Sequence, residues 1–237
     1  MPKLGSSSPV KLASLYSGGK DSTFSIHRAE QLGHKVVCLL TMHPAADDSP
    51  LFHYPNSHIT KYLADAMQIP AIDRPVAGGT KEDEMKALGE SIAQAKAMYN
   101  IEGVLYGGIS SLYQKQAFEQ VCKDHELEPV APLWHSDPTE YMNELVESGY
   151  KILIVGVSAM GLGKEWLGVT LDKESLTRLA SLGKKHGFNL TFEGGEAETL
   201  VIDCPLFQKR LDIRRASVQW DGQRGIFEIL EAALVEK

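Results

Sequence analysis

The sequence lacks the features that would place it in a membrane or hold it together with disulfides. Among its 237 residues, no apolar run approaches the ~20 residues of a membrane-spanning helix, and the first residues lack the apolar core of a signal peptide. It has three cysteines, Cys38, Cys122 and Cys204, without a CxxC pair or a metal-type spacing. Isolated cysteines are typical of reducing compartments. We therefore expect a cytoplasmic protein with buried free thiols and no membrane partner.

The sequence also lacks an excess of positive charge. It carries 24 lysines and arginines against 31 aspartates and glutamates, which gives a formal net charge of −7. Proteins that bind nucleic acid normally present a basic face to the phosphate backbone, so nucleic acid is not an expected partner. With 43% hydrophobic and 23% charged residues, the composition is that of an ordinary globular protein. The length allows one large domain or two modest ones.

Two common phosphate-binding motifs are missing, G-x-x-x-x-G-K-[ST] and G-x-G-x-x-G. In their place, residues 15–24 read "LYSGGKDSTF". A mostly apolar run over residues 10–16 predicts a strand, and a helix is expected from residue 22 to a stop at Gly33. The chain must therefore turn sharply between a buried strand and a helix.

The residue types in this turn are those of a phosphate cradle. Gly18 and Gly19 accept positive φ angles and allow another group to approach the backbone closely. The free N–H groups of a helix start attract anions, Lys20 adds a full positive charge, and Ser17 and Ser22 add hydroxyl donors. The alternative is an ordinary strand–turn–helix with an exposed charge pair. In both interpretations the turn is expected to be exposed.

Strand and helix patterns alternate along the first part of the chain. Strands are predicted at 35–41, 69–75 and 103–108, and helices at 57–67, 80–97 and 111–125. This alternation predicts a parallel α/β sheet with right-handed crossovers. A soft boundary near residue 135 separates residues 1–135 from a second, smaller α+β domain at 136–237. In that domain we expect helices at 138–148 and 173–186 and strands at 150–159, 201–207, 209–220 and 225–230.

Two further glycine-containing segments are candidates for a ligand site. "GGISSLYQ" at 107–114 follows a predicted strand. Because ligands of open α/β sheets lie beyond the carboxyl ends of the strands, Gly108 and Ser110 are expected on the second lip of a nucleotide crevice. A simple helix N-cap explains one of its serines equally well.

"EGGEAET" at 193–199 places Glu193, Glu196 and Glu198 around another glycine pair. Three carboxylates in this arrangement suit Mg²⁺, a cationic substrate or the positioning of a nucleophile. On charge alone a solvated acidic turn is favoured. If the segment is extended, alternation puts Glu196 and Glu198 on one side.

Two loops add less specific signals. Residues 42–56 form a long turn-rich segment that ends in "FHYPN", and long loops are often functional. "SAMGLGKEWLG" at 158–168 carries Trp166 among glycines. A flexible lid and a packed turn are both compatible with that composition.

Taken together, these segments resemble the diphthine–ammonia ligase family. The loop at 17–22 resembles the S-G-G-x-D-S loop of ATP pyrophosphatases, the PP-loop superfamily, which cleave ATP between its α and β phosphates. Over residues 10–207 the following segments occur in the order of the family: "LYSGGKDS", "LFHYPN", "GTKEDEM", "LYQKQAFEQVC", "APLW", "VGVSAMGLGKEWLG" and "EGGEAETLVIDCPLF". Members of the family amidate diphthine on elongation factor 2, the last step of diphthamide synthesis.

The resemblance implies a fold, a reaction and a set of residues. The first domain is then of the adenine nucleotide alpha hydrolase-like, Rossmann-like type, with ATP as substrate and Mg²⁺ as the expected metal, whose ligands stay unassigned. The acceptor carboxylate becomes an acyl-adenylate with release of pyrophosphate, and ammonia displaces AMP. No glutaminase module is expected, so ammonium is the nitrogen source.

The implied nucleotide-binding residues are Ser17, Gly18, Gly19, Lys20, Asp21, Ser22, Gly108 and Ser110. The implied catalytic residues are Lys20, Asp21 and Glu196. The implied substrate-binding residues are His53, Tyr54, Asn56, Glu84, Tyr113, Gln114, Trp166, Glu193 and Glu198. For the trimethylammonium group of diphthine, the aromatic face of Trp166 and the carboxylates of Glu84 and Glu196 are the expected partners.

Three positions depart from the usual residues of the family. Lys115 and Val169 stand where arginine is usual, and Gly163 stands where aspartate is usual. Two other functions stay open. One is a tRNA-modifying PP-loop enzyme that adenylates a base, although the paired cysteines of thiolating members are absent. The other is a non-catalytic ATP-binding module. The oligomeric state is also open, and it includes a homodimer.

Overall fold

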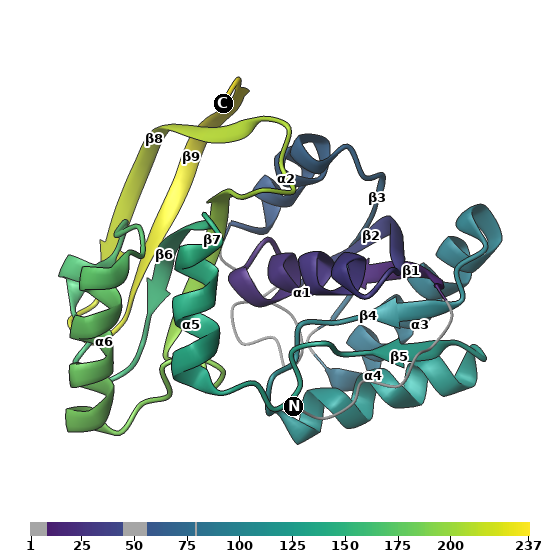
Figure 1. Cartoon of the computed structure of the whole chain (residues 1–237), viewed down its shortest axis with the longest axis horizontal. Helices are drawn as coiled ribbons and strands as arrows, with labels where there is room; N and C mark the ends of the chain where they lie inside the picture. The colour runs from purple at the N-terminus through teal and green to yellow at the C-terminus, as the bar shows by residue number, and fades with distance from the viewer. Residues whose placement is uncertain (1–8, 45–55, 79) are drawn as a thin grey trace.

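The computed structural model of the chain describes residues 9–44, 56–78 and 80–237. These residues form two β-sheets from consecutive parts of the chain, with helices packed around both (Figure 1). No helix in the described ranges combines the length and the apolar character of a membrane span.

The first sheet is parallel throughout, with the strand order β3-β2-β1-β4-β5. This confirms the predicted Rossmann-like α/β architecture. Its strands are β1 (Lys11–Leu15), β2 (Lys35–His43), β3 (Ala71–Pro75), β4 (Gly103–Leu105) and β5 (Glu128–Val130). The sequence does not predict β5, because its three residues contain no apolar run. The strand order reverses between β1 and β4, which is where open α/β sheets bind ligands.

Helices connect these strands as the alternation predicts. They are α1 (Lys20–Gln31), the 3₁₀ turn η1 (Ser57–Ile59), α2 (Thr60–Met67), α3 (Lys81–Tyr99) and α4 (Leu112–Asp124). The apolar sides of α1 and α2 pack on one face of the sheet, and those of α3 and α4 pack on the other. α1 begins two residues earlier than predicted, with Gly19 as its N-cap. Lys20 and Asp21 therefore belong to the first turn of a helix.

Helix ends follow local sequence signals. The Thr80 side chain accepts a hydrogen bond from the Asp83 N–H, and the Asp83 carboxylate accepts one from the Thr80 N–H, which forms a capping box at the start of α3. Gly33 follows α1 with a φ angle of +89°, which confirms its predicted role as a stop. Asp137 caps α5 (Pro138–Glu147) through the N–H groups of Thr139 and Glu140.

The second sheet is antiparallel, with the order β7-β6-β9-β8, and α5 and α6 lie beside it (Figure 1). Its elements are β6 (Lys151–Val157), the 3₁₀ turn η2 (Lys164–Trp166), α6 (Lys173–His186), β7 (Ala197–Asp203), β8 (Arg210–Trp220) and β9 (Gly225–Val235). This confirms the smaller α+β part. The strand predicted at 201–207 is shifted, because β7 begins at Ala197 and ends before Cys204-Pro205, where proline cannot continue a ladder. The glutamate segment therefore runs directly into a strand.

One apolar core joins the two sheets. Leu12 of β1 belongs to the same buried cluster as Leu200 of β7 and Ile229 of β9. The neighbouring Ala13 points to the opposite face and joins the cluster under α3 and α4, as alternation along a strand requires. Because the two parts share this core, the loop at the end of β1 lies at their junction.

Candidate active site

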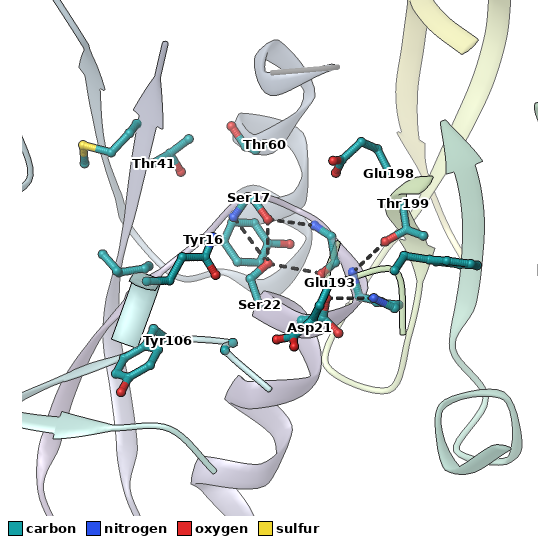
Figure 2. A pocket seen from close by; sticks show the side chains of 18 of the residues that line it. Tyr16, Ser17, Asp21, Ser22, Thr41, Thr60, Tyr106, Glu193, Glu198 and Thr199 are labelled. Atoms are coloured by element: carbon teal, nitrogen blue, oxygen red, sulfur yellow. Dashed lines mark hydrogen bonds and ion pairs between the residues drawn. The ribbon is translucent and has the colours of Figure 1, made fainter. Parts of the chain in front are cut away.

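A pocket of about 250 Å³ opens beyond the carboxyl ends of β1, β2 and β4. It contains the turn after β1, the start of α4 and the segment leading into β7 (Figure 2). The predicted residues that line it are Ser17, Gly19, Lys20, Asp21, Ser22, Gly108, Gln114, Glu193 and Glu198. The fold thus brings together segments that are far apart in the sequence. The hydrogen bond from the Lys20 N–H to Thr199 Oγ1, for example, joins residues 179 positions apart.

In the phosphate loop (residues 17–22), Gly18 is required by its backbone conformation and by the close approach of Leu63. Gly18 has a φ angle of +79°, and a Cβ atom there would lie 2.8 Å from a methyl group of Leu63. Its carbonyl accepts a hydrogen bond from the Val201 N–H of β7 at 2.9 Å. The second sheet therefore helps to shape the turn that the first sheet begins.

The two lips of the crevice touch through their backbones. A Cβ atom at Gly107 would lie 2.6 Å from the carbonyl carbon of Asp21 and 2.7 Å from the amide nitrogen of Ser22. Any larger residue would push the end of β4 away from the start of α1. The sequence motif predicts a role for Gly108 but not for Gly107, because the need for glycine at residue 107 comes only from this packing.

Lys20 is buried, with 2% of its surface exposed, so the expectation of an exposed turn is wrong for this residue. Its Nζ donates to Asp21 Oδ2 at 2.8 Å and to the carbonyl oxygen of Thr191 at 2.5 Å, and it lies 5.6 Å from the centre of the Phe192 ring. Thr191 and Phe192 belong to the segment before β7. The ammonium group is therefore held in one position by both parts of the molecule.

Asp21 has a partner for each carboxylate oxygen. Oδ2 accepts from Lys20, and Oδ1 accepts from the hydroxyl of Tyr141 in α5 at 2.6 Å. Burial and the neighbouring Asp21 raise the pKa of Tyr141 well above its usual value, so the hydroxyl keeps its proton and donates it to the carboxylate. Tyr141 was not identified from the sequence, in which it is one apolar position of an amphipathic helix.

Glu193 bridges the two parts of the molecule. Its Oε1 accepts from the N–H groups of Ile109 and Ser110 at 2.5 and 2.9 Å, and its Oε2 accepts from the Ser110 hydroxyl. Ser110 thus contacts Glu193 at the rim, while Ser111 provides the N-cap of α4. Glu193 lines the pocket, and its carboxylate is stabilised by hydrogen bonds from these backbone N–H groups and the Ser110 hydroxyl.

Glu196 has a different task from the one predicted. Its two carboxylate oxygens accept from the N–H groups of Asn189 and Gly194, at 2.9 and 2.8 Å, and it is not among the residues that line the pocket. The carboxylate therefore stabilises the turn in which it lies. The expectation that Glu196 and Glu198 share a side does not hold, because the chain turns at residues 192–196 and becomes a strand only at Ala197.

Glu198 is the carboxylate of this segment that points into the pocket (Figure 2). It is opposite Gly156 of β6, where a Cβ atom would lie only 3.0 Å from the Glu198 Cβ. The next residue, Thr199, accepts a hydrogen bond from the Lys20 N–H through Oγ1 at 3.3 Å. Adjacent residues of one strand thus contact the pocket and the phosphate loop.

The chain matches two family models that together cover most of it. Residues 10–129 match the diphthamide synthase N-terminal domain, and residues 137–235 match the diphthamide synthase C-terminal domain. The chain belongs to the diphthine–ammonia ligase family. It is therefore a ligase of diphthamide biosynthesis.

Curated members of this family are similar over most of the chain. A human diphthine–ammonia ligase is 33% identical over 227 residues, which cover 88% of this chain and 85% of the human protein. A rat diphthine–ammonia ligase is 34% identical, with 85% and 82% covered. A diphthine–ammonia ligase from Schizosaccharomyces pombe is 34% identical over 85% of this chain, but this match covers only 36% of the yeast protein.

Several residues assigned from the diphthine–ammonia ligase resemblance lie away from the pocket. Trp166 is 1% exposed, and the guanidinium of Arg178 covers its ring at 4.8 Å. The packed-turn alternative therefore holds, and the ring is not open to a substrate cation. Glu84 is 1% exposed on α3. Tyr113 is exposed, with the Lys81 ammonium 4.3 Å from its ring.

Asn56 joins two parts of the fold. Its Nδ2 donates to the Phe227 carbonyl at 2.9 Å, and its Oδ1 accepts from the Ile229 N–H at 2.7 Å. Both polar atoms of the Asn56 side chain are thus hydrogen-bonded to the backbone of β9, and this explains the residue without the predicted substrate-binding role. His53 and Tyr54, its neighbours in the same predicted set, lie outside the described residues.

The structure adds pocket residues that are not among the site residues implied by the diphthine–ammonia ligase resemblance. They are Tyr16, Leu40, Thr41, Met42, Thr60, Tyr106, Phe118 and Thr199. Most of them lie at or just beyond the carboxyl ends of β1, β2 and β4. The rule for ligand sites in parallel sheets predicts this edge, but it does not tell which side chains point inward.

Proposed function

We propose that the protein amidates diphthine on elongation factor 2, using ATP and ammonium and releasing AMP and pyrophosphate. Residues 1–135 would bind ATP, and residues 136–237 would form the wall of the acceptor site. The observation that carries this proposal is the meeting of the Ser17–Ser22 loop with Glu198 in one pocket. The names of the relatives supply the acceptor and the nitrogen donor. The free cysteines support a cytoplasmic setting.

The shape and lining of the pocket suit a nucleotide. Its polar end has the serine hydroxyls of the phosphate loop and the charge of Lys20, where the pyrophosphate end of ATP would bind. Its other end has apolar and aromatic side chains, Leu40, Met42 and Phe118 among them, against which a base would pack. This orientation places the α-phosphorus between the phosphate loop and β7.

The residues present also fit a Mg²⁺ ion that arrives with ATP. Mg²⁺ usually binds one or two carboxylates together with substrate phosphates and water, and Asp21 and Glu198 both line the pocket. No set of three or more His, Cys, Asp or Glu side chains within the described ranges forms a metal cage. Bound there, the ion would neutralise charge on the phosphates.

The chain's own residues would then serve two steps. The acceptor carboxylate attacks the α-phosphorus, and pyrophosphate leaves towards the phosphate loop, where the fixed ammonium of Lys20 stabilises its charge. Ammonia next attacks the acyl carbon of the adenylate, and AMP leaves. We propose Glu198 as the partner of a cationic nitrogen, either ammonium or the trimethylammonium group, because its carboxylate points into the pocket.

The deciding experiment measures nucleotide products. The protein is incubated with ATP, Mg²⁺, ammonium and elongation factor 2 that carries diphthine, and AMP and ADP are separated by chromatography. We expect AMP and the new amide to form in equal amounts. When ammonium or the acceptor is omitted, no AMP should accumulate over the time that the complete mixture needs for several turnovers. ADP as the main product contradicts the proposal. ATP binding without acceptor-dependent turnover would identify a binding module, and AMP formed with tRNA would identify a base-modifying enzyme.

A further inference from the structure

We infer that Tyr141 is a positioning residue that acts through Asp21 on the phosphate-binding Lys20. This inference rests on the proposed use of ATP at the loop of residues 17–22. It concerns how the second part of the molecule controls the charge at the ATP site. Tyr141 lies in α5, outside the phosphate loop and outside the lining of the pocket.

The contacts form a chain of three side chains. The Tyr141 hydroxyl donates to Asp21 Oδ1 at 2.6 Å, and Asp21 Oδ2 accepts from Lys20 Nζ at 2.8 Å. The two ends of one carboxylate are thus fixed from opposite sides. A carboxylate fixed in this way cannot rotate without breaking a charge-assisted hydrogen bond, which is stronger than a neutral one.

Packing leaves the Tyr141 ring little freedom. Tyr141 is 3% exposed, and its ring lies 5.8 Å from that of Phe24 in α1. Phe24 in turn contacts Tyr150 with a ring distance of 5.2 Å and His27 with 5.4 Å. Aromatic clusters of this kind hold their members in fixed geometry. The hydroxyl is therefore aimed at Asp21 by the core that joins α1 and α5.

The position of Asp21 matters for Lys20 because few other groups hold the ammonium. Apart from Asp21, the Lys20 ammonium donates to the Thr191 carbonyl, a neutral acceptor, and lies over the Phe192 ring, so among the described residues Asp21 is its charged partner. If Asp21 turns away, the ammonium loses its charged partner and its place relative to the phosphates. Misplacement of a catalytic charge by a fraction of an ångström to one ångström is costly, because transition-state stabilisation depends on geometry fixed in advance.

Tyr150 offers a matched control for this inference. It is 1% exposed, lies in the same aromatic cluster, and its hydroxyl is within 3.2 Å of His27 Nδ1. Tyr150→Phe and Tyr141→Phe each remove one buried hydroxyl from the same core. Only Tyr141→Phe removes a contact to the phosphate loop.

The first measurement is steady-state AMP formation by the full chain. We expect Tyr141→Phe to lower kcat about tenfold, as loss of a hydrogen bond to a charged group would, and to change the KM for ATP less than about threefold. Tyr150→Phe should stay within about twofold of the parent protein in both constants. Both variants should show similar, small decreases of the melting temperature. Equal kcat values in the two variants overturn the inference. A lower kcat in Tyr141→Phe also overturns it if that variant's melting temperature falls much further than that of Tyr150→Phe.

A second measurement does not need turnover. The affinity for inorganic pyrophosphate with Mg²⁺ is measured by calorimetry, and we expect Tyr141→Phe to weaken it about threefold while Tyr150→Phe leaves it unchanged. Unchanged affinity in Tyr141→Phe overturns the inference even where the parent makes no AMP. Absence of AMP from the parent, by contrast, contradicts the proposed function and not the role of Tyr141.

A double-mutant comparison tests whether Tyr141 acts through Asp21. In an Asp21→Asn background, Tyr141→Phe should cause less than about a twofold further change in pyrophosphate affinity, because the charged acceptor is already gone. A full threefold effect in that background would mean that the hydroxyl acts by another route, and the inference would be wrong.

Discussion

The phosphate loop (residues 17–22) and the glutamate loop (residues 193–199) each place charged residues around two adjacent glycines, yet they differ in how they use them. In the phosphate loop, neighbouring residues line one pocket. In the glutamate loop, three identical side chains have three tasks. Glu193 bridges to the segment before α4, Glu196 stabilises its own turn, and Glu198 points into the pocket.

This difference shows what a local motif specifies. A strand–turn–helix junction fixes the directions of consecutive N–H groups, so its motif predicts a site directly. A run of glutamates fixes only composition, and each carboxylate binds the donors that the fold brings near it. Four predictions test how far this comparison holds.

The largest effect is expected at Lys20. Lys20→Met keeps the length of the buried side chain and removes its charge, so AMP formation should fall about 100-fold or more. The measurement is the rate of acceptor-dependent AMP release. Lys35→Met, at an exposed position in β2, is the control and should leave the rate unchanged. A rate within tenfold of the parent would remove Lys20 from the proposed chemistry.

Glu198→Gln should lower the amidation rate about tenfold, equivalent to about 1.4 kcal/mol of transition-state stabilisation. The substitution keeps the shape of the side chain in the pocket and removes its charge. ATP affinity in the absence of Mg²⁺, measured by calorimetry, should change little, because Lys20 and the loop amides are intact. An unchanged amidation rate would return Glu198 to the interpretation of a solvated acidic residue.

Glu196→Gln should lower the stability of the fold, whereas Glu198→Gln should lower the amidation rate. The amide can replace only one of the two oxygens that accept from the N–H groups of Asn189 and Gly194. We expect the free energy of unfolding to fall by about 1 kcal/mol, measured by denaturant titration, with Glu198→Gln as the matched control. If Glu196→Gln lowers the rate more than Glu198→Gln does, the assignment of tasks within this loop is wrong.

The smallest effect is expected where the two loops touch. Thr199→Val is nearly isosteric and removes the acceptor of the Lys20 N–H. A neutral hydrogen bond contributes about 1 kcal/mol, and this one is long, so ATP affinity should change by about threefold at most. Thr177→Val on the exposed face of α6 removes a comparable hydroxyl and is the control. A tenfold effect would show that the second sheet holds the phosphate loop more firmly than the contacts indicate.

Much of the fold follows from the sequence because its signals are local. The alternation of apolar strands and amphipathic helices predicts the parallel sheet, Thr80 and Gly33 mark helix ends, and the paired glycines mark the turn after β1. The clearest differences are β5, the bounds of β7, and the end of β9, which runs to Val235 and not to residue 230. Short strands without an apolar run leave no pattern to detect.

The candidate site is less predictable because its side-chain partners are far apart along the chain. Asp21 and Tyr141 are separated by 120 residues, and Asn56 and Ile229 by 173. The glycine-rich loop around Trp166 has a composition compatible with a lid, yet Trp166 is buried under Arg178. Which polar group meets which depends on how the two sheets pack, and no local pattern carries that information.

The sequence by itself determined the phosphate loop, the order of strands and helices along the chain, and the parallel sheet at whose edge the loop lies. Each of these depends on backbone preferences within a few residues. The tertiary structure decided that Lys20 is buried, that Tyr141 holds Asp21, and that Glu198 rather than Glu196 faces the pocket. The reason is physical: hydrogen bonds in a buried site must be satisfied by whatever donors and acceptors the shared core brings together.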